Sequence, residues 1–450
     1  MDRRDLDVEW VDSNAPTRRN STDSLHAMMA SSSTDVSINT PHDDRSHAAA
    51  KCQDLSTMPP IMEKVNTKLD VEKNSKCSDK LLQTKLSLRQ RLHHFTWAWF
   101  TLPMSSGGLS LLIYAQPYQF PGLNTIGTVV YSINLVIFTL VCLAMLFRFV
   151  FNHDDMTRSV LHHREGLFFP TFFLAIATLI TSTERFAIPQ NSTSYIWATE
   201  TIFWVYLVVT SILAVAQYSY LFAGPSYGLQ SMMPGWLLPV FPVMLAGTVA
   251  SVILEMQDKI NPLPIIVAGL TCQGLGFSIA MMMYAHMIGR LMQSGLPNRE
   301  HRTGLFMCVG PPAFTALALI GLADRLPETL VSSGQFAIHV ETVRAVALLS
   351  AIFLWALSFW WFLIAAIAVA LAPPKNFHLG WWPLVFPNTG FTLATISIGN
   401  QFQCAGILWF SVALSLLVII TFCVVLYFNI RAVFIGEIMY PGKDEDADDH

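Results

Sequence analysis

Ten apolar segments, each about 20 residues long, follow one another between residues 92 and 442. Their approximate cores are residues 95–115, 125–150, 167–183, 195–222, 236–254, 262–290, 304–322, 342–371, 382–399 and 404–432. A helix of this length crosses the hydrocarbon core of a bilayer, so the pattern predicts an all-α integral membrane protein. Because the connecting loops are short, neighbouring helices are expected to run antiparallel.

Charged side chains are concentrated before these segments. Only 13% of the 450 residues are charged, yet residues 1–91 hold 14 basic and 14 acidic side chains. Residues 1–85 are rich in Ser, Thr, Asp and Asn, and such a segment buries too little apolar surface to fold alone. We therefore predict a disordered cytoplasmic tail (1–85), a ten-helix membrane domain (86–435) and an acidic cytoplasmic C-terminal tail (436–450). The net charge of −4 gives no indication of nucleic acid as a partner.

The seven cysteines follow no metal-binding spacing and read as small core residues. No cluster of His, Asp, Glu or Cys at membrane depth indicates catalysis. We therefore expect no metal, no cofactor and no enzymatic activity. No feature of the sequence indicates that the protein is a receptor.

One proline lies near the middle of each odd-numbered segment, and no even-numbered segment has an equivalent. The five prolines are separated by 67, 72, 69 and 76 residues, and they are Pro103, Pro170, Pro242, Pro311 and Pro387. Five residues after each proline lies a small side chain, namely Gly108, Ala175, Gly247, Ala316 and Thr392. This periodicity predicts five helical hairpins related by pseudo-five-fold symmetry.

The physical effect of the prolines favours a pore. Proline removes a backbone donor and bends a helix, and the polar groups it frees are tolerated only against protein or a water-filled path. Small residues let helices approach closely. We therefore expect the odd-numbered helices to surround a central pore and the even-numbered helices to face lipid. The alternative, that proline is simply commoner in membrane helices, is disfavoured by five prolines in register.

The expected pore lining is polar but uncharged. Besides the five prolines, the residues expected to line it are Thr101, Ser105, Ser106, Thr171, Thr248, Thr315, Asn388 and Thr389. No buried Lys, Arg, Asp or Glu is expected in the ring. A cation path usually contains acidic residues, whereas hydroxyls, amides and the dipoles of kinked helices suit an anion.

Phenylalanine precedes the proline in three repeats, at Phe169, Phe241 and Phe386. A bulky ring at a bend can close a narrow path. We predict Phe386 as the pore gate, because Asn388 and Thr389 follow it and the neighbouring Gly390 would let the ring move. Phe241 is a further pore-lining candidate, although ordinary packing is the alternative for Phe169 and Phe241.

The loops also predict the orientation. Basic side chains number seven in the loops that precede odd-numbered segments and four in the others, which predicts cytoplasmic N- and C-termini. Asn191 begins an Asn-Ser-Thr triplet on the predicted outer side and is expected to be glycosylated, whereas Asn20 is expected to stay cytoplasmic and unmodified. At the cytoplasmic mouth, Arg91, His93 and His94 either attract anions or serve as ordinary positive flanks of the first helix.

Several blocks resemble a known family. They are "RLHHFTWAWFTLPMSSGGLSLLI" (91–113), "GLNTIGTVVY" (122–131), "CQGLGF" (272–277), "FMCVGPPAFTALALI" (306–320), "FPNTGF" (386–391) and "YPGKDEDAD" (440–448). Residues 86–448 thereby resemble the tellurite-resistance/dicarboxylate transporter family, which includes plant slow anion channels and fungal sulfite pumps. The resemblance implies five hairpins around a central pore, often in a trimer, with the blocking phenylalanine of the ninth helix at Phe386.

The resemblance also implies a substrate. The Gly-Pro-Pro-Ala-Phe block and the acidic C-terminal motif resemble the malate branch of the family, which implies malate and related C4 dicarboxylates such as succinate and fumarate. It also implies transport across a fungal plasma membrane. The sequence itself shows no pair of basic residues within the membrane that would select a dicarboxylate. A sulfite efflux pump and a general anion channel of the same family therefore remain the alternatives.

Overall fold

The computed structural model describes residues 88–152, 155–162, 164–190, 194–224, 228–327 and 339–440. The chain divides into two units, Met1–Thr84 and Lys85–His450, and the described residues belong to the second. All regular structure in these residues is helical. The predicted N-terminal tail, the last ten residues of the predicted C-terminal tail, Asn20 and Asn191 lie outside the described residues.

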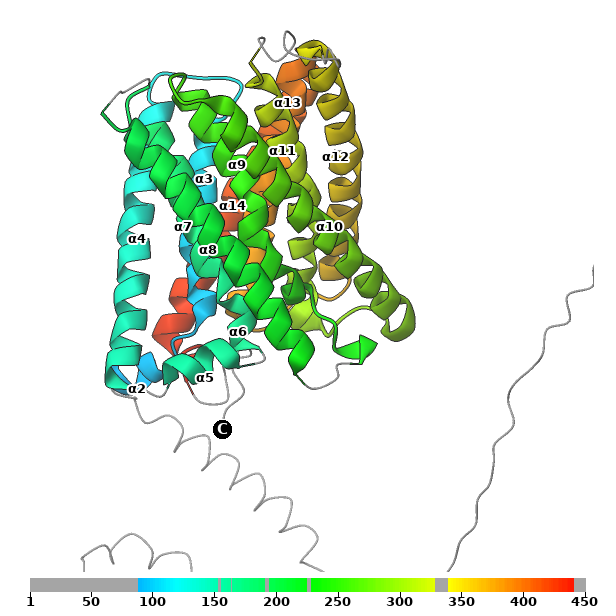
Figure 1. The fold of residues 1–450 in the computed structure, drawn as a ribbon. Coiled ribbons are helices and arrows are strands. Elements are labelled where there is room, and N and C mark those ends of the chain that lie inside the picture. The colour runs from blue at the N-terminus through cyan, green and yellow to red at the C-terminus, as the bar shows by residue number, and fades with distance from the viewer. Residues whose placement is uncertain are drawn as a thin grey trace, which may run out of the picture. The chain divides into compact units, whose positions relative to one another are not determined.

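Five long helices form the outside of this unit (Figure 1). They are α4 (Leu123–Phe151), α8 (Ile196–Ala223), α10 (Pro262–Ser294), α12 (Val340–Leu371) and α14 (Ala405–Ile435). At a rise of about 1.5 Å per residue, each exceeds the roughly 30 Å of a bilayer's hydrocarbon core. Their outward side chains include Phe353, which is 78% exposed, and Phe434, which is 85% exposed. Such a surface is suited to contact with lipid.

Five shorter helices, each with a buried proline in its first turn, form the inside. They are α3 (Thr101–Tyr114), α7 (Pro170–Phe186), α9 (Phe241–Met256), α11 (Gly310–Asp324) and α13 (Phe386–Phe402). A separate short segment precedes each of them: η1 (Trp97–Phe100), α6 (Glu165–Phe168), η3 (Pro234–Val240), η4 (Arg299–Val309) and η6 (Leu379–Leu384). Four of these segments are 3₁₀-helices. Proline cannot donate an α-helical hydrogen bond, so the helix changes type where the sequence predicted a bend.

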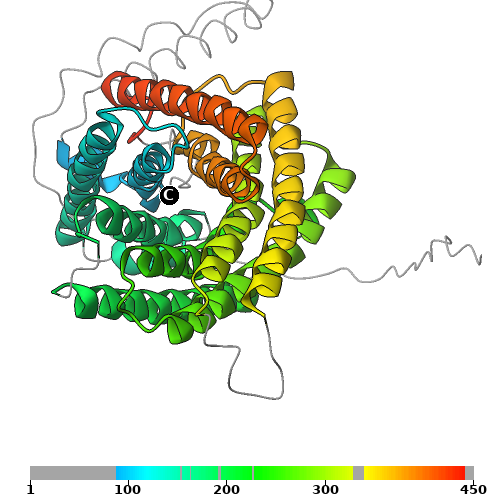
Figure 2. The ribbon, with the colours of Figure 1, turned by 90° about the horizontal axis from the view of Figure 1, so that it is seen from above.

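The short helices close into a ring. Contacts run from α3 to α7, α9, α11 and α13 in turn, and α13 returns to contact α3. The segments that precede them close a second ring in the same order, η1, α6, η3, η4 and η6. Figure 2 shows the short helices inside and the long helices packed around them. The inner helices thus combine residues from the whole length of the unit around one axis.

Within the described residues, eight helical stretches are long and apolar enough to cross a membrane. They are the five long helices together with Glu165–Phe186, Pro234–Met256 and Arg299–Asp324, in which an inner helix is joined to its preceding segment. This confirms the predicted all-α membrane class. The inner helices α3 and α13 are not among the eight, although both take part in the ring.

Glycine residues allow α3 to approach its neighbours closely. A Cβ atom at Gly107 would clash with the side chain of Thr178 on α7 and with Asn134 on α4. A Cβ atom at Gly108 would lie 3.2 Å from Cδ2 of Phe386 on α13. The glycine pair therefore leaves room for the side chains of three other helices at the level of the ring.

A buried ion pair holds α6, which begins the second repeat, against α4. Nη1 of Arg148 lies 2.5 Å from Oε1 of Glu165, and the two side chains are 8% and 6% exposed. Nη1 of Arg148 also donates to the carbonyl oxygen of Phe95 at 2.6 Å, and the hydroxyl of Ser159 donates to Oε1 of Glu165 at 2.6 Å. These bonds offset part of the cost of taking both charges out of water. Arg148 is therefore part of the packed structure.

We predict that Arg148→Met destabilises the protein by about 3–5 kcal/mol, because it leaves the Glu165 carboxylate buried without its partner. The double variant Arg148→Met/Glu165→Leu should recover most of the loss, since no buried charge remains. Thermal unfolding of the purified protein in detergent measures both. If the double variant melts no higher than Arg148→Met, the pair is not what stabilises this contact.

Candidate functional site

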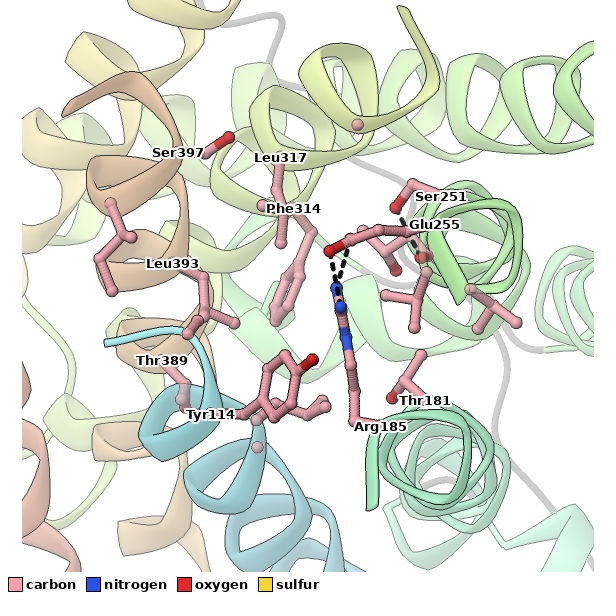
Figure 3. Close-up of a pocket in the computed structure, with 18 of the residues that line it drawn as sticks. Tyr114, Thr181, Arg185, Ser251, Glu255, Phe314, Leu317, Thr389, Leu393 and Ser397 are labelled. Carbon is pink, nitrogen blue, oxygen red and sulfur yellow. Dashed lines mark hydrogen bonds and ion pairs between the residues drawn. The ribbon is translucent and has the colours of Figure 1, made fainter. Parts of the chain in front are cut away.

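The inner ring encloses a cavity of about 360 Å³, which we call the upper cavity (Figure 3). All five inner helices line it, through residues that include Gly108, Thr178, Thr248, Phe314 and Thr389. It extends toward the C-terminal ends of these helices, where Tyr114, Arg185, Glu255, Asp324 and Gln401 line its mouth. The upper cavity therefore lies on the axis that the sequence analysis predicted for a pore.

Three phenylalanine rings from three inner helices pack together at the lower end of this cavity, and we call them the aromatic barrier. Phe386 of α13 stacks on Phe314 of α11 with ring centroids 5.0 Å apart and planes inclined by 26°. The edge of Phe314 in turn meets Phe241 of α9, with centroids 6.3 Å apart and planes at 82°. Phe314 and Phe386 line the upper cavity, and all three rings are buried.

Each ring of the barrier lies against a glycine of another inner helix. A Cβ atom added at any of these glycines would lie within 3.2 Å of the ring, and the contacts are Phe386 to Gly108, Phe314 to Gly390 and Phe241 to Gly310. The sequence analysis expected Gly390 to free the ring of Phe386. The structure instead places Gly390 beneath Phe314, where it provides room rather than a hinge.

The mouth of the upper cavity contains a charged pair. The Arg185 side chain extends from α7 between Tyr114 and Glu255 (Figure 3). Its Nη1 donates to Oε1 of Glu255 at 2.6 Å, a second bond joins Nη2 to Oε2, and the guanidinium carbon lies 4.7 Å from the Tyr114 ring centroid. The expectation was of no buried charged residue in the ring, and this pair lies at the end of the ring, where the side chains of Arg185 and Glu255 are 12% and 41% exposed. The apolar cores ended at 183, 254 and 322, just before the charged last turns of α7, α9 and α11.

A second cavity, of about 490 Å³, lies among the segments that precede the inner helices, and we call it the lower cavity. Its walls come from the α6 region, η3, η4, η6 and the end of α10. Four basic side chains line it, Arg164, Arg290, His301 and His378, and no described lining residue is acidic. The two cavities share no lining residue. They are separate spaces at the two ends of the same set of repeats.

A closed helical ring with cavities at both ends and a barrier between them is an arrangement for passing a small solute, and comparison with known proteins agrees. The family model described as "SLAC1: Voltage-dependent anion channel" matches residues 94–430.

The chain belongs to this anion channel family.

Two relatives come from Schizosaccharomyces pombe. The "Malic acid transport protein" is 34% identical over 80% of this chain and 83% of the relative. A second protein, named only provisionally for malic acid transport, is 30% identical over 81% of this chain and 85% of its own length. The "Sulfite efflux pump SSU1" of Trichophyton rubrum is more distant, at 25% identity over 69% of this chain and 84% of the relative. The family resemblance is confirmed, and this member of the anion channel family is a multi-pass membrane protein.

Several residues predicted to line the pore take other positions. Thr101 donates to the carbonyl oxygen of Ala98 at 2.5 Å, and Ser106 donates to Asn134 of α4. Asn388 donates to the carbonyl oxygen of Leu384 at 2.7 Å. Thr101, Ser106 and Asn388 line neither cavity, and the same holds for the buried Ser105.

Two of the residues predicted to line the pore, Thr389 and Thr248, do line the upper cavity, and their hydroxyl groups are bonded within their own helices. Thr389 donates to the carbonyl oxygen of Val385 at 2.9 Å, and Thr248 donates to that of Leu245 at 2.8 Å. These hydroxyl protons are therefore not directed at a solute. The charged guanidinium of Arg185 is a stronger hydrogen-bond donor than these hydroxyl groups.

The residues predicted at the cytoplasmic mouth belong to another part of the structure. Arg91, on α2 (Leu88–His93), donates from Nη2 to the carbonyl oxygen of Val433 at 2.7 Å and lies over the ring of Tyr440. The rings of His93 and His94 are 5.4 Å apart, and none of the three residues lines either cavity. Their attraction for anions stays a prediction. The arginines that line the lower cavity, Arg164 and Arg290, contributed to the sequence analysis only through the loop charges that predict the membrane orientation.

The sequence contained a signal for the mouth of the upper cavity. Counting thirteen to fifteen residues from the prolines of the second to fifth repeats, about four helical turns, reaches Arg185, Glu255, Asp324 and Asn400. All four line the upper cavity. No comparable repeat pattern indicated Phe314 as a cavity residue. The aligned residue of the second repeat is also a phenylalanine, Phe173, but it is not among the residues that line either cavity.

We predict that Phe386→Ala and Phe314→Ala each raise passive anion conductance severalfold, because each removes one ring of the stacked pair that closes the upper cavity. Phe241→Ala should have a smaller effect, since that ring does not line the upper cavity. Voltage-clamp currents, normalised to surface protein, measure the change.

The matched control is Phe169→Ala. Phe169 also precedes a proline, but its ring packs edge-on against Trp97 and lines neither cavity. It should leave the conductance unchanged. Equal currents from the parent, Phe314→Ala and Phe386→Ala would show that these rings are ordinary packing.

Proposed function

We propose that this chain carries malate and related C4 dicarboxylate anions across the plasma membrane, along the axis of the inner ring. The observation that carries the proposal is the pair of stacked rings, Phe314 and Phe386, between two separate cavities. Such an arrangement lets a small solute occupy either end while one narrow barrier prevents free leakage. The choice of malate rests on the two S. pombe relatives.

The charges along this axis support an anion as the solute. The N-termini of all five inner α-helices point toward the lower cavity, and a helix N-terminus carries a partial positive charge. Arginine lines both cavities, through Arg164 and Arg290 below and Arg185 and Arg325 above. A cation would meet this field unfavourably at the lower end, whereas Glu255 and Asp324 balance the two arginines of the upper cavity.

We infer that all ten helices cross the membrane as five hairpins with pseudo-five-fold symmetry. Besides the eight long apolar stretches, the proposal requires α3 and α13 to cross. Their position in a closed ring with α7, α9 and α11 supports this, because a ring around a path needs every member at the same depth. The short segments η1 and η6 extend them toward the lower end.

The same account assigns the lower cavity to the cytoplasm. The exposed or partly exposed basic residues at that end are Arg158, Arg164, Arg290, Arg299, Arg302 and Lys375. Those at the upper end are Arg185, Lys259, Arg325 and Arg344. The excess of positive charge on the lower side favours a cytoplasmic location for it and for both termini. Asn191 would then be extracellular.

Other partners follow from the same proposal. Succinate and fumarate carry the same two carboxylates and should compete with malate. The lipid bilayer would contact the apolar faces of the five long helices. A homotrimer, which the family resemblance implies, would use part of that same surface for contacts between copies.

Sulfite efflux is the rival function, because a sulfite pump is also among the relatives. Cells that express the full chain should accumulate [¹⁴C]malate above cells without it, and an excess of succinate or fumarate should reduce that uptake. Growth in sulfite should be no better than in the control cells. Increased sulfite tolerance without malate flux would reverse the assignment.

A further inference from the structure

Arg290, near the C-terminal end of α10, has no partner for two of its buried nitrogen atoms. Nε and Nη1 are buried and make no hydrogen bond within the protein. Arg91 and Arg148 also have a buried Nε without a partner, but another nitrogen of each donates to a backbone carbonyl oxygen. Two buried guanidinium nitrogen atoms without a hydrogen-bond partner are unfavourable unless something outside the chain binds them.

None of the described residues that line the lower cavity provides a counter-ion for Arg290. The other charged or titratable residues that line the lower cavity are Arg164, His301 and His378. The neighbouring Glu300 does not line the cavity, and its Oε1 accepts a hydrogen bond from the backbone of Lys375 at 3.1 Å. The cavity therefore concentrates positive charge without a carboxylate of its own.

The upper cavity shows the contrasting case. There the guanidinium of Arg185 is already bound by both oxygens of the Glu255 carboxylate. This planar, two-bond contact is the geometry in which arginine prefers carboxylates. The lower cavity also contains a guanidinium, that of Arg290, but no described lining residue supplies a carboxylate for it.

The frame of the lower cavity is held in place by hydrogen bonds between two repeats. The hydroxyl of Thr303 on η4 donates to the carbonyl oxygen of Gly380 on η6 at 2.8 Å. Nε2 of His378 lies 2.7 Å from the carbonyl oxygen of Glu300. The cavity volume of about 490 Å³ is within the range of small-molecule sites and holds a four-carbon dianion with water.

We propose that Arg290 binds one carboxylate of the dicarboxylate substrate in the lower cavity, before the substrate reaches the aromatic barrier. The proposal rests on the proposed transport of dicarboxylates and names the side chain that captures them on one side of the membrane. The second carboxylate lies among the remaining basic side chains of the cavity. Arg290 thus acts as a specificity-determining residue for a dianion.

The test uses the purified full chain in nanodiscs of zwitterionic lipid, with L-malate as the probe. Arg290→Gln should raise the half-saturating malate concentration for thermal stabilisation by about tenfold or more, the effect of losing a charge-assisted contact. Arg290→Lys should recover part of the affinity. In proteoliposomes, the same variants should raise the half-saturating concentration for malate flux from the lower side.

The matched control is Arg158→Gln, which removes an exposed positive charge from α5 (Asp155–Leu161), outside both cavity linings. It should change the half-saturating concentration less than twofold, about the effect of a screened surface charge. Without malate, Arg290→Gln should melt no lower than the parent, since Arg290 Nε and Nη1 have no internal hydrogen bond to lose. An equal half-saturating concentration in the parent and Arg290→Gln would overturn the proposal.

Further probes separate this proposal from the proposed function. If malate is carried equally well by the parent and Arg290→Gln, dicarboxylate transport stands and the role of Arg290 fails. If malate neither binds nor moves but sulfite stabilises the parent through Arg290, the anion site stands and dicarboxylate transport fails. If only phosphatidylglycerol added to the nanodiscs stabilises the protein through Arg290, the site binds a lipid phosphate and the proposal is overturned.

Discussion

The missing backbone donor of five prolines is the constraint on which this structure depends. At each of them the α-helical hydrogen-bond pattern must begin anew, so every inner helix consists of a short segment followed by an α-helix. Groups left without an α-helical partner are costly in lipid, which requires these junctions to lie inside protein. The long helices without interior prolines enclose them. The two closed rings, the two cavities and the inner position of all five prolines follow from this requirement.

The junctions also determine what lies between the cavities. At the start of α13 the chain presents Phe386, and one turn into α11 it presents Phe314, so the two rings meet at one level. Gly108 and Gly390 leave space for them where any larger residue would displace a ring. The two stacked rings form a thin barrier, and the cavities on its two sides differ in the charges that line them. Above it Arg185 is paired with Glu255, whereas no described residue that lines the cavity below it is acidic.

Much of this architecture could be predicted from the sequence, because apolar length and proline spacing are local signals. The hairpin order and the inner position of the proline-containing helices follow from them, and the role of Phe386 as the gate stays a prediction. Phe314 and Arg290 could not be found in this way, since their roles depend on which residues of other repeats lie opposite. Arg185 was missed for another reason. The apolar pattern ends before the helix does, and the last turn of α7 carries the charged side chain into the cavity mouth.

Accessibility of engineered cysteines from each side of the membrane tests the central claim most directly. Ser397→Cys lies in the upper cavity and Met307→Cys in the lower cavity, in a background with Cys52, Cys77, Cys404 and Cys423 replaced by serine. A charged, membrane-impermeant thiol reagent should label each cysteine from one side only, and from opposite sides. With Phe386→Ala added, labelling of both positions should proceed from either side. Labelling of both cysteines from the same side in the presence of Phe386 would contradict a barrier between the two cavities.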